Sequence, residues 1–379
     1  MPRSFGGHEC PKVSYGDTSF NSIRVSPEKT GQAGSFFIEM KIDLRSDTVT
    51  KPTAEMLEAM FSAEVGDDVL NEDPSLNELE KKAAKIFGME AGLFCPSGIM
   101  TNQLAIKVQT SPGDEVICDK TAHVYNFEGG GIAFNSGCSV RLMNGSRGKY
   151  SAEEVLQNIN PDNVHHPDTR LVVVENTSNK GGGSIWSFDE IRKIKDVCVE
   201  NKLSFHLDGA RIFNALIETK ETATKYGEVF DTISICLSKG LGAPVGSVLL
   251  GKADVIKKAR RFRRVFGGGM RQGGYLGAAG IYALDYHIER LKDDHRRAKE
   301  LAVIIGILPI VEEVLPVETN IIMFSLNPNL SEKEFLNKIA EKDLLAVPFG
   351  KQTIRMVTHL DFTDDQLSET KKILTKLFA

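Results

Sequence analysis

A lysine at the end of an apolar segment could act as a nucleophile. Ser238 and Lys239 directly follow residues 232–237, a β-branched, apolar run that predicts a strand. A lysine at the end of a buried strand has few structural uses, because desolvation disfavours the charged ammonium. A neutral amine can form a Schiff base with an aldehyde. Lys239 is therefore a candidate nucleophile.

Asp208 makes this chemistry more specific, because it follows a second apolar segment, residues 203–207. An aspartate that pairs with a pyridinium nitrogen and a lysine that binds the aldehyde are the two protein groups that pyridoxal 5′-phosphate (PLP) requires. The pair predicts a PLP enzyme. A Schiff-base aldolase without a cofactor is an alternative, but it would not need Asp208 or a phosphate site.

A phosphate site is indicated where Ser97, Gly98 and Ile99 begin a predicted helix directly after the apolar residues 92–95. The N-terminus of a helix offers free backbone N–H groups and the positive end of the helix dipole. By itself this turn could equally be an ordinary loop. Together with Asp208 and Lys239 it favours a seat for the cofactor phosphate.

His123 follows the predicted strand 115–118. Taken alone, it could be a surface histidine or one satisfied within the core. The functional hypothesis is an imidazole that stacks on the cofactor ring. Since histidine titrates near neutral pH, it could also take a proton from a substrate hydroxyl.

Two arginines are candidates for binding a carboxylate. Arg211 lies three residues after Asp208, and Arg355 lies within the apolar segment 353–357. A lone arginine is usually a solvated or paired surface group. An arginine inside an apolar strand needs a partner, and a substrate carboxylate is a good bidentate one.

Short apolar runs alternate with helical patterns through most of the chain. The fold class that follows is α/β, with a mostly parallel central sheet, helices on both faces and a smaller C-terminal α+β domain. A long helix is expected from residue 276 to about 307. We expect a disordered leader over 1–39, an N-terminal segment and large PLP-binding domain over 40–305, and the small domain over 306–379.

Composition excludes several classes of function. The 379 residues are 41% hydrophobic and 26% charged with a net charge of −5, which is ordinary for a soluble globular protein and gives no argument for nucleic acid. The basic run 257–264 is therefore expected to be a solvated helix face. No glycine triplet forms a dinucleotide motif. The apolar run 301–315 is too short and interrupted to span a membrane.

The location of the protein is predicted from its cysteines and from the first 38 residues. The six cysteines are scattered without a Cys-x-x-Cys pair, which favours buried free thiols in a reducing compartment. The first 38 residues lack a signal-peptide core. Cytoplasm is therefore the expected location.

With these residues placed, the chain closely resembles the low-specificity L-threonine aldolases, which are fold type I (aspartate-aminotransferase-like) PLP enzymes. The resemblance runs from about residue 41 to the C-terminus. It rests on a series of motifs in one order, namely residues 43–48, 65–69, 72–74, 96–98, 175–177, 208–211, 238–242, 267–272 and 357–360.

The resemblance implies a reaction and a role for each matching residue. The reaction is cleavage of L-threonine, L-allo-threonine and related β-hydroxy-α-amino acids to glycine and an aldehyde, in a homotetramer whose sites form between subunits. Lys239 would bind the cofactor, Asp208 would protonate its ring nitrogen and His123 would stack on it. The remaining roles would be phosphate or cofactor contacts from Ser97, Gly98, Ile99, Ser238, Arg211 and Arg271, and a substrate-carboxylate grip from Ser46, Arg211 and Arg355.

Three positions depart from the family. Many relatives have Thr where this chain has Ile99, so one hydroxyl contact to the phosphate is missing. Many also have His in place of Ser178 and Tyr in place of Leu70, on the side of the substrate's β-substituent, which leaves open the preferred aldehyde and how the hydroxyl is held. A β-eliminating PLP lyase of the same fold, acting on aromatic or sulfur-containing amino acids, is the nearest alternative. An inactive binding or scaffold protein would leave the lysine, the aspartate and the arginines without a reason.

Overall fold

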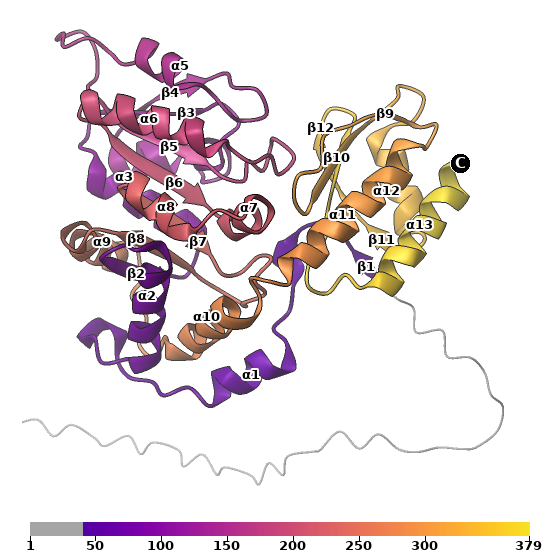
Figure 1. The fold of residues 1–379 in the computed structure, drawn as a ribbon, viewed down its shortest axis with the longest axis horizontal. Coiled ribbons are helices and arrows are strands. Elements are labelled where there is room, and N and C mark those ends of the chain that lie inside the picture. Colours follow the sequence, from indigo (N-terminus) through magenta and orange to yellow (C-terminus); the bar gives the residue numbers. More distant parts are fainter. Residues whose placement is uncertain (1–40) are drawn as a thin grey trace, which may run out of the picture. The chain divides into compact units, whose positions relative to one another are not determined.

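The structure is a computed structural model that describes residues 41–379 (Figure 1). The expected leader, residues 1–39, lies outside the described residues. The described chain is an α/β protein with a large sheet between helices and a smaller antiparallel sheet formed near the C-terminus, which confirms the predicted fold class.

The large sheet has seven strands in the order β2-β8-β7-β6-β5-β3-β4 within residues 41–379. Only β8 runs antiparallel to its neighbours, so the predicted parallel character is confirmed. Most of these strands are buried on both faces, which explains their near-continuous apolar sequences. Their bounds are β2 (Ala91–Cys95), β3 (Glu115–Asp119), β4 (Ser139–Met143), β5 (Thr169–Glu175), β6 (Ser204–Gly209), β7 (Thr232–Cys236) and β8 (Ser247–Gly251).

Helices cover both faces of this sheet, and each face has its own hydrophobic core. Val172 and Val174 of β5 belong to one core, whereas Leu171 and Val173 belong to another, as the alternation along a strand requires. The first core holds α1 (Ala54–Phe61), α2 (Pro74–Phe87), α5 (Ala152–Gln157), α6 (Phe188–Glu200), α7 (Ile212–Thr219), α8 (Ala223–Val229) and α10 (Gly274–Tyr286). The other face is covered by α3 (Gly98–Gln109) and α9 (Ala253–Val265).

The loops that carry the candidate residues leave the same edge of the sheet. Parallel strands bring their carboxyl ends to one edge, which is where ligands bind in open α/β sheets. The register aligns Glu175 at the end of β5 with Asp208 of β6, and Asp208 with Ser234 of β7. The sheet therefore places the segments after β5, β6 and β7 side by side.

The smaller sheet has the order β12-β13-β10-β9 and a separate hydrophobic core. Its strands and helices are β9 (Val311–Val314), β10 (Ile321–Leu326), β12 (Val347–Gly350), β13 (Thr353–Val357), α11 (Leu291–Gly306), α12 (Glu332–Ala340) and α13 (Asp364–Phe378). The N-terminal strand β1 (Ile42–Asp43) pairs in parallel with β11 (Leu344–Leu345), and Ile42 and Leu44 enter the same core. The division of domains near residue 305 stays a prediction.

One predicted element is wrong. The expected long helix from 276 to 307 is two helices, α10 and α11, separated at residues 287–290. At this break His287 Nδ1 lies 2.7 Å from the carbonyl oxygen of Leu241, and Arg290 donates to the carbonyl oxygen of Gly240 at 3.3 Å. The interruption therefore lets two side chains support the turn that follows Lys239.

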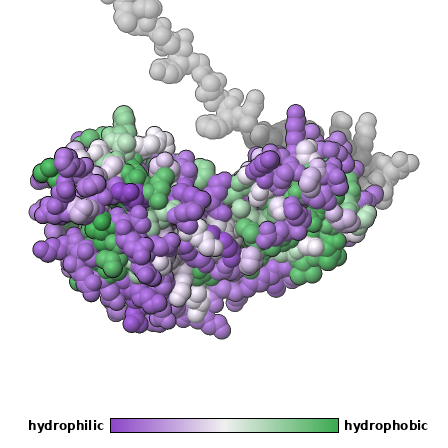
Figure 2. All heavy atoms as spheres, turned by 90° about the horizontal axis from the view of Figure 1, so that it is seen from above, coloured by the Kyte–Doolittle hydropathy of each residue, from purple (hydrophilic) through white to green (hydrophobic). Residues whose placement is uncertain are grey.

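The basic run also differs from its expected role. Arg263 on α9 is buried and forms an ion pair with Asp68, and Arg260 forms ion pairs with Asp68 and Glu80. Part of the run therefore faces the interior rather than solvent. Elsewhere, on the face seen in Figure 2, hydrophilic residues predominate and hydrophobic residues gather in separate patches.

Two further predictions concern cysteines and membranes. Cys95, Cys118, Cys138, Cys198 and Cys236 are free and buried, as expected, whereas Cys10 lies outside the described residues. Within residues 41–379, no helix has the length and apolar character needed to cross a bilayer.

Candidate active site

A pocket of about 160 Å³ lies at the carboxyl edge of the large sheet. It brings together seven of the predicted site residues: Ser97, Gly98, Ile99, His123, Asp208, Ser238 and Lys239. Pro96, Asn102, Ala210 and Cys236 complete its lining. These residues come from the segments after β2, β3, β6 and β7, so the pocket is a direct product of the parallel sheet.

Lys239 is held through its backbone. Its carbonyl oxygen accepts hydrogen bonds from the N–H of Gly242 at 2.8 Å and from Thr50 Oγ1 at 3.2 Å. Gly242 has φ +74°, a conformation that glycine adopts without strain, so it closes the turn tightly. The side chain is half-buried and forms no ion pair with any residue of 41–379. Its amine is therefore available at the pocket.

Asp208 lies at the end of β6 and is only 2% exposed. Its Oδ2 accepts a hydrogen bond from Asn102 Nδ2 at 2.9 Å, and its Oδ1 accepts one from the N–H of Ala210 at 3.2 Å. Within the described chain it has no arginine or lysine partner. A buried carboxylate without a cationic partner is well suited to a cationic ring nitrogen.

The helix α3 starts at the pocket wall. Ser97 caps it by accepting a hydrogen bond from the N–H of Met100 at 3.2 Å, while the N–H groups of Gly98 and Ile99 have no partner in residues 41–379. A Cβ at Gly98 would lie 2.6 Å from Cys236 Sγ, so only glycine allows this approach of helix and strand. Two adjacent free amides at a helix start are an anion-binding arrangement.

His123 is fixed at both its backbone and its ring. Its N–H donates to Glu175 Oε2 at 2.7 Å, and its Nδ1 lies 2.9 Å from Glu128 Oε1. Burial lowers the pKa of His123, but the hydrogen bond to Glu128 and the negative charges of Asp208 and Glu128 outweigh it, so the pKa lies above its ordinary value. The acidic neighbours therefore favour the protonated form of the ring.

Arg211 already has a carboxylate partner. Its Nε and Nη2 donate to the two carboxylate oxygens of Asp47, both at 2.7 Å, and both side chains are buried. Burial raises the pKa of Asp47, but the charge and hydrogen bonds of Arg211 outweigh it and hold the pKa well below its usual range. Binding of a substrate carboxylate by Arg211 therefore stays a prediction.

Arg355, in contrast, has no carboxylate partner in the described chain. Its Nη1 donates to Asn179 Oδ1 at 2.8 Å, its Nη2 donates to the carbonyl oxygen of Arg45 at 3.1 Å, and its guanidinium lies 4.1 Å from the centre of the Phe349 ring. Its Nε is buried without a hydrogen-bond partner. Burial and the charge of Arg211 lower its pKa to about 10. Within residues 41–379 this buried guanidinium therefore has no carboxylate to balance its charge, and its binding of a substrate carboxylate stays a prediction.

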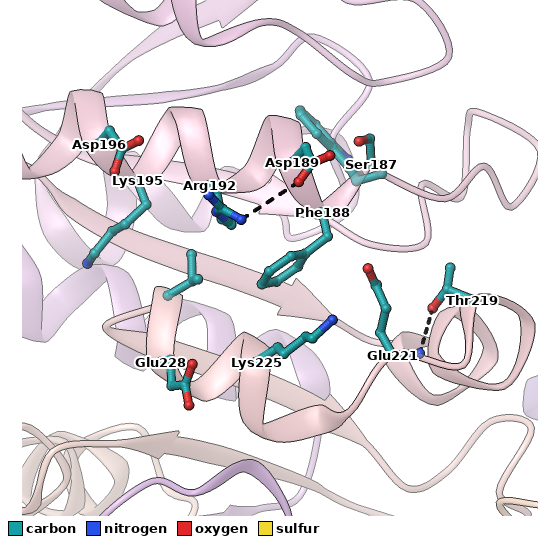
Figure 3. Close-up of a pocket in the computed structure, with 12 residues that line it drawn as sticks. Ser187, Phe188, Asp189, Arg192, Lys195, Asp196, Thr219, Glu221, Lys225 and Glu228 are labelled. Carbon is teal, nitrogen blue, oxygen red and sulfur yellow. Dashed lines mark hydrogen bonds and ion pairs between the residues drawn. The ribbon is translucent and has the colours of Figure 1, made fainter.

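A larger groove of about 730 Å³ lies elsewhere, between α6 and α8 (Figure 3). Its side chains carry both signs of charge, and Arg192 on its wall lies 3.9 Å from Asp189. The ring of Phe188 and the amine of Lys225, 5.6 Å apart, approach each other across it. None of the predicted site residues lines this groove, so size alone does not identify the active site.

Comparison with known proteins adds the family. A model of the beta-eliminating lyase family matches residues 43–328. The low-specificity L-threonine aldolase of Escherichia coli K12 is 39% identical over 86% of this chain and 96% of its own length. That of Saccharomyces cerevisiae is 38% identical over 90% of this chain and 88% of its own length.

The chain belongs to the low-specificity L-threonine aldolase family. The predicted resemblance is thus confirmed. A solved structure of the threonine aldolase of Leishmania major has the same fold, with a TM-score of 0.76 at 20% identity over 89% of this chain and 99% of that chain. Members of this aldolase family are PLP enzymes of fold type I.

The pocket of this aldolase-family chain fits PLP. Lys239 offers an amine, Asp208 an unpaired buried carboxylate, and α3 two free backbone N–H groups, which match an aldehyde, a ring nitrogen and a phosphate respectively. Lys239, Asp208 and the start of α3 all line the same small pocket. The roles of the individual residues remain predictions.

Six positions predicted for the aldolase family lie outside this pocket, namely Ser46, Leu70, Ser178, Arg211, Arg271 and Arg355. Arg271 is exposed and pairs with Asp67 at 2.8 Å, and Ser46 caps the short 3₁₀ helix 47–49 that contains Asp47. Leu70 is exposed. Ser178 is buried, and its hydroxyl accepts a hydrogen bond from the N–H of Gly181 at 3.3 Å. Of the three departures from the family, only Ile99 lines the pocket.

The sequence analysis missed four polar residues that hold the site: Asp47, Asn102, Glu128 and Glu175. Asn102 lies four residues after Gly98, so the helical spacing of α3 could have placed it at the pocket. Glu175 accepts hydrogen bonds from the N–H groups of His123 and Asn179, and burial and the charge of Asp208 raise its pKa to about 7. No local signal distinguishes Glu128 from a surface glutamate.

Proposed function

We propose that this protein is a PLP-dependent aldehyde-lyase that cleaves L-threonine, L-allo-threonine and related β-hydroxy-α-amino acids to glycine and an aldehyde. The observation that carries the proposal is the pocket that brings Lys239, Asp208, His123 and the start of α3 together. The relatives named low-specificity L-threonine aldolases, at 36–39% identity, support the same reaction.

The cofactor half of the site is formed by groups of the large sheet. PLP, when bound, supplies a protonated ring that takes up the electron pair released as the bond between Cα and Cβ breaks. Lys239 holds the cofactor through its amine, and Asp208 keeps the ring nitrogen protonated. The amides of Gly98 and Ile99, with Ser97 and Ser238, bind the phosphate.

His123 is the proposed base. It would lie against the cofactor ring and, directly or through a water, would take the proton from the substrate β-hydroxyl at Nε2. Support comes from the geometry of the imidazole, because Nδ1 is occupied by Glu128 and Nε2 has no hydrogen-bond partner within residues 41–379. A base of this kind contributes typically about 10²–10⁴-fold to a rate.

The substrate carboxylate binds at Arg355, Ser46 and Arg211. Arg355 forms the main bidentate contact, because its charge is unpaired in the described chain, while Ser46 and Arg211 contribute next to it. Such a clamp would fix the rotation about Cα and so would orient the bond that breaks. Orientation of this kind is the protein's main contribution to the rate.

A β-eliminating lyase acting on aromatic or sulfur-containing amino acids is the second candidate, because the matching family model carries that description. It would use the same cofactor groups but release pyruvate and ammonia. The names of the relatives that match over most of the chain favour the aldolase reaction.

The assembly and location are also part of the proposal. We infer a homotetramer in the cytoplasm, in which Arg271 reaches a cofactor phosphate across a subunit interface. Buried free thiols support a reducing compartment. The exposed position of Arg271 leaves its guanidinium accessible to a second subunit.

Product analysis tests the reaction. The purified, cofactor-loaded protein is incubated with threonine, allo-threonine, phenylserine and serine, and glycine, aldehydes, keto acids and ammonia are quantified. We expect glycine with acetaldehyde from threonine and allo-threonine, and glycine with benzaldehyde from phenylserine. Keto acid and ammonia without glycine would establish elimination and contradict the proposal.

A further inference from the structure

Glu128 contacts the ring of His123 and has no part in the proposed mechanism so far. Its carboxylate is buried, and it accepts three hydrogen bonds from side chains: from His123 Nδ1 at 2.9 Å, from Asn102 Nδ2 at 2.9 Å and from Gln103 Nε2 at 2.6 Å. No arginine or lysine pairs with it in the part of the chain that the structure describes. Buried carboxylates are rare unless they are paired or fully hydrogen-bonded.

The glycine triplet 129–131 explains how this arrangement fits. A Cβ at Gly131 would lie 2.5 Å from Cδ of Gln103, so glycine at this position leaves the room that the amide needs to reach Glu128. Gly129 and Gly130 have open space at this position, so Gly131 is the residue of the triplet that the packing against Gln103 requires.

Asn102 joins the same carboxylate to Asp208. Its Nδ2 donates to Glu128 Oε1 and to Asp208 Oδ2, both at 2.9 Å, and its Oδ1 lies 3.1 Å from His206 Nε2. Burial lowers the pKa of His206 to about 4, so this imidazole is neutral at neutral pH. Carboxylates only accept, so the amide of Asn102 has one orientation, with Nδ2 toward Glu128 and Asp208 and Oδ1 toward His206. The neutral ring of His206 therefore carries its proton on Nε2, and its Nδ1 accepts from Thr232 Oγ1 at 2.8 Å.

The charged groups around His123 come from several elements. Glu128 and Asp208 favour its protonated form, Lys239 opposes it, and Glu175 contacts its backbone. Among these, only Glu128 forms a hydrogen bond with the ring. A carboxylate acceptor at Nδ1 fixes the tautomer that carries the proton on Nδ1, which leaves Nε2 as the free, basic nitrogen.

We propose that Glu128 is the positioning residue of this site: it holds His123 in the tautomer protonated at Nδ1, and through Asn102 it holds His123 and Asp208 as one hydrogen-bonded unit. The proposal rests on the proposed role of His123 as the base. During turnover the proton on Nδ1 stays with the imidazole, while Nε2 takes and returns the substrate proton. Glu128 stabilises the imidazolium without touching the substrate.

Histidine NMR on the cofactor-loaded protein tests this directly. The ¹⁵N signals of His123 are assigned by their loss in His123→Asn, and their shifts report which nitrogen carries the proton. We expect the tautomer protonated at Nδ1 in the unsubstituted protein. A neutral ring protonated at Nε2 would overturn the proposal, whether or not any Glu128 variant folds.

Glu128→Gln is the matched variant, because it keeps the acceptor oxygen and removes the charge. We expect the pKa of His123 to fall by about one unit and the acidic limb of the pH profile of kcat/KM for threonine to move to lower pH by the same amount. Glu80→Gln is the control: Glu80 is also buried, but it bonds to the N–H of Phe94 and to Arg260, so the titration of His123 should not change.

The outcomes separate the two proposals. An unchanged titration of His123 in Glu128→Gln would assign Glu128 a structural role only and overturn the inference, even if threonine is cleaved. Absence of glycine from threonine in the unsubstituted protein would overturn the proposed function, while the tautomer and the titration would still decide the role of Glu128.

Discussion

The regions around Arg211 and Arg355 differ in a way that residue type does not reveal. Both guanidinium groups are buried, and both were predicted to bind a substrate carboxylate. Arg211 forms a bidentate ion pair with Asp47. Within residues 41–379, Arg355 contacts instead the amide oxygen of Asn179, the carbonyl oxygen of Arg45 and the ring of Phe349.

The difference separates a buried arginine that has a carboxylate partner from one that has none within residues 41–379. A buried ion pair with well-aligned hydrogen bonds is internally satisfied, and removing one partner leaves an uncompensated charge. Arg355 has no such counter-charge in residues 41–379, although its guanidinium donates to Asn179 and to the carbonyl oxygen of Arg45. We therefore expect Arg355 to make the main contact with the substrate carboxylate and Arg211, paired with Asp47, to make the smaller contribution.

Replacement of Lys239 should have the largest effect, and it is the reference for the arginine variants. Lys239→Ala should remove the visible absorption of the bound cofactor and abolish threonine cleavage, because no other amine lines the pocket in the described residues. The exposed Lys292 provides the control variant, Lys292→Ala, with an unchanged spectrum and rate. An unaltered visible spectrum in Lys239→Ala would contradict the assignment of the cofactor-binding lysine.

Replacement of Arg355 tests whether this arginine binds the substrate carboxylate. Arg355→Ala should lower kcat/KM for threonine by about 100-fold or more, since the substrate carboxylate loses a buried charged partner, while the cofactor spectrum stays the same. Arg355→Lys should recover only part of the loss, because an ammonium cannot make the bidentate contact. Equal activity in all three proteins would refute the idea that this arginine awaits the substrate.

Breaking the ion pair between Asp47 and Arg211 should affect mainly the stability of the protein. Asp47→Asn should lower the free energy of unfolding at pH 7 by about 3 kcal/mol, because Arg211 is left buried without its counter-charge. The pKa of Asp47 is lowered in the fold, so its contribution is present above the ordinary value of 3.8 and is lost as the pH falls below it. The urea midpoints of the two proteins should therefore differ most at neutral pH and converge in acid.

Arg271 offers a third, exposed arginine and the smallest expected change in stability. Arg271→Ala should leave the thermal midpoint of the apoprotein unchanged, because exposed ion pairs contribute little. It should nevertheless weaken PLP binding several-fold in a fluorescence titration if the guanidinium reaches a phosphate across the interface. An identical dissociation constant would remove Arg271 from the cofactor site.

The sequence was informative where chemistry coincides with the end of a strand. Asp208, His123 and Lys239 follow apolar strands, and the rule that parallel strands share a carboxyl edge is enough to bring them together. The partner of Arg211 could not be found this way, since Asp47 is 164 residues distant and belongs to no strand of that sheet. Long-range pairing of charges depends on tertiary packing, which leaves no local pattern.

The two wrong predictions, a single helix over residues 276–307 and a solvated helix face over residues 257–264, also result from tertiary packing. The apolar and helical character of 276–307 continues across the break between α10 and α11, because the interruption is imposed by contacts of His287 and Arg290 with the turn after Lys239. Burial of Arg263 depends on Asp68, far from it in sequence. In both cases the tertiary contact overrides the local pattern.

The pairing of β1 with β11 also constrains how the protein can be made. A ribosome releases residues 42–47 early, yet the strand that pairs with β1 and the arginine that donates to the carbonyl oxygen of Arg45 emerge only when residues 344–355 are synthesised. Strand β1 therefore stays without its partner strand until almost the whole polypeptide has been synthesised. Shortening the gene from either side into these segments should give an incompletely folded product rather than a smaller working enzyme.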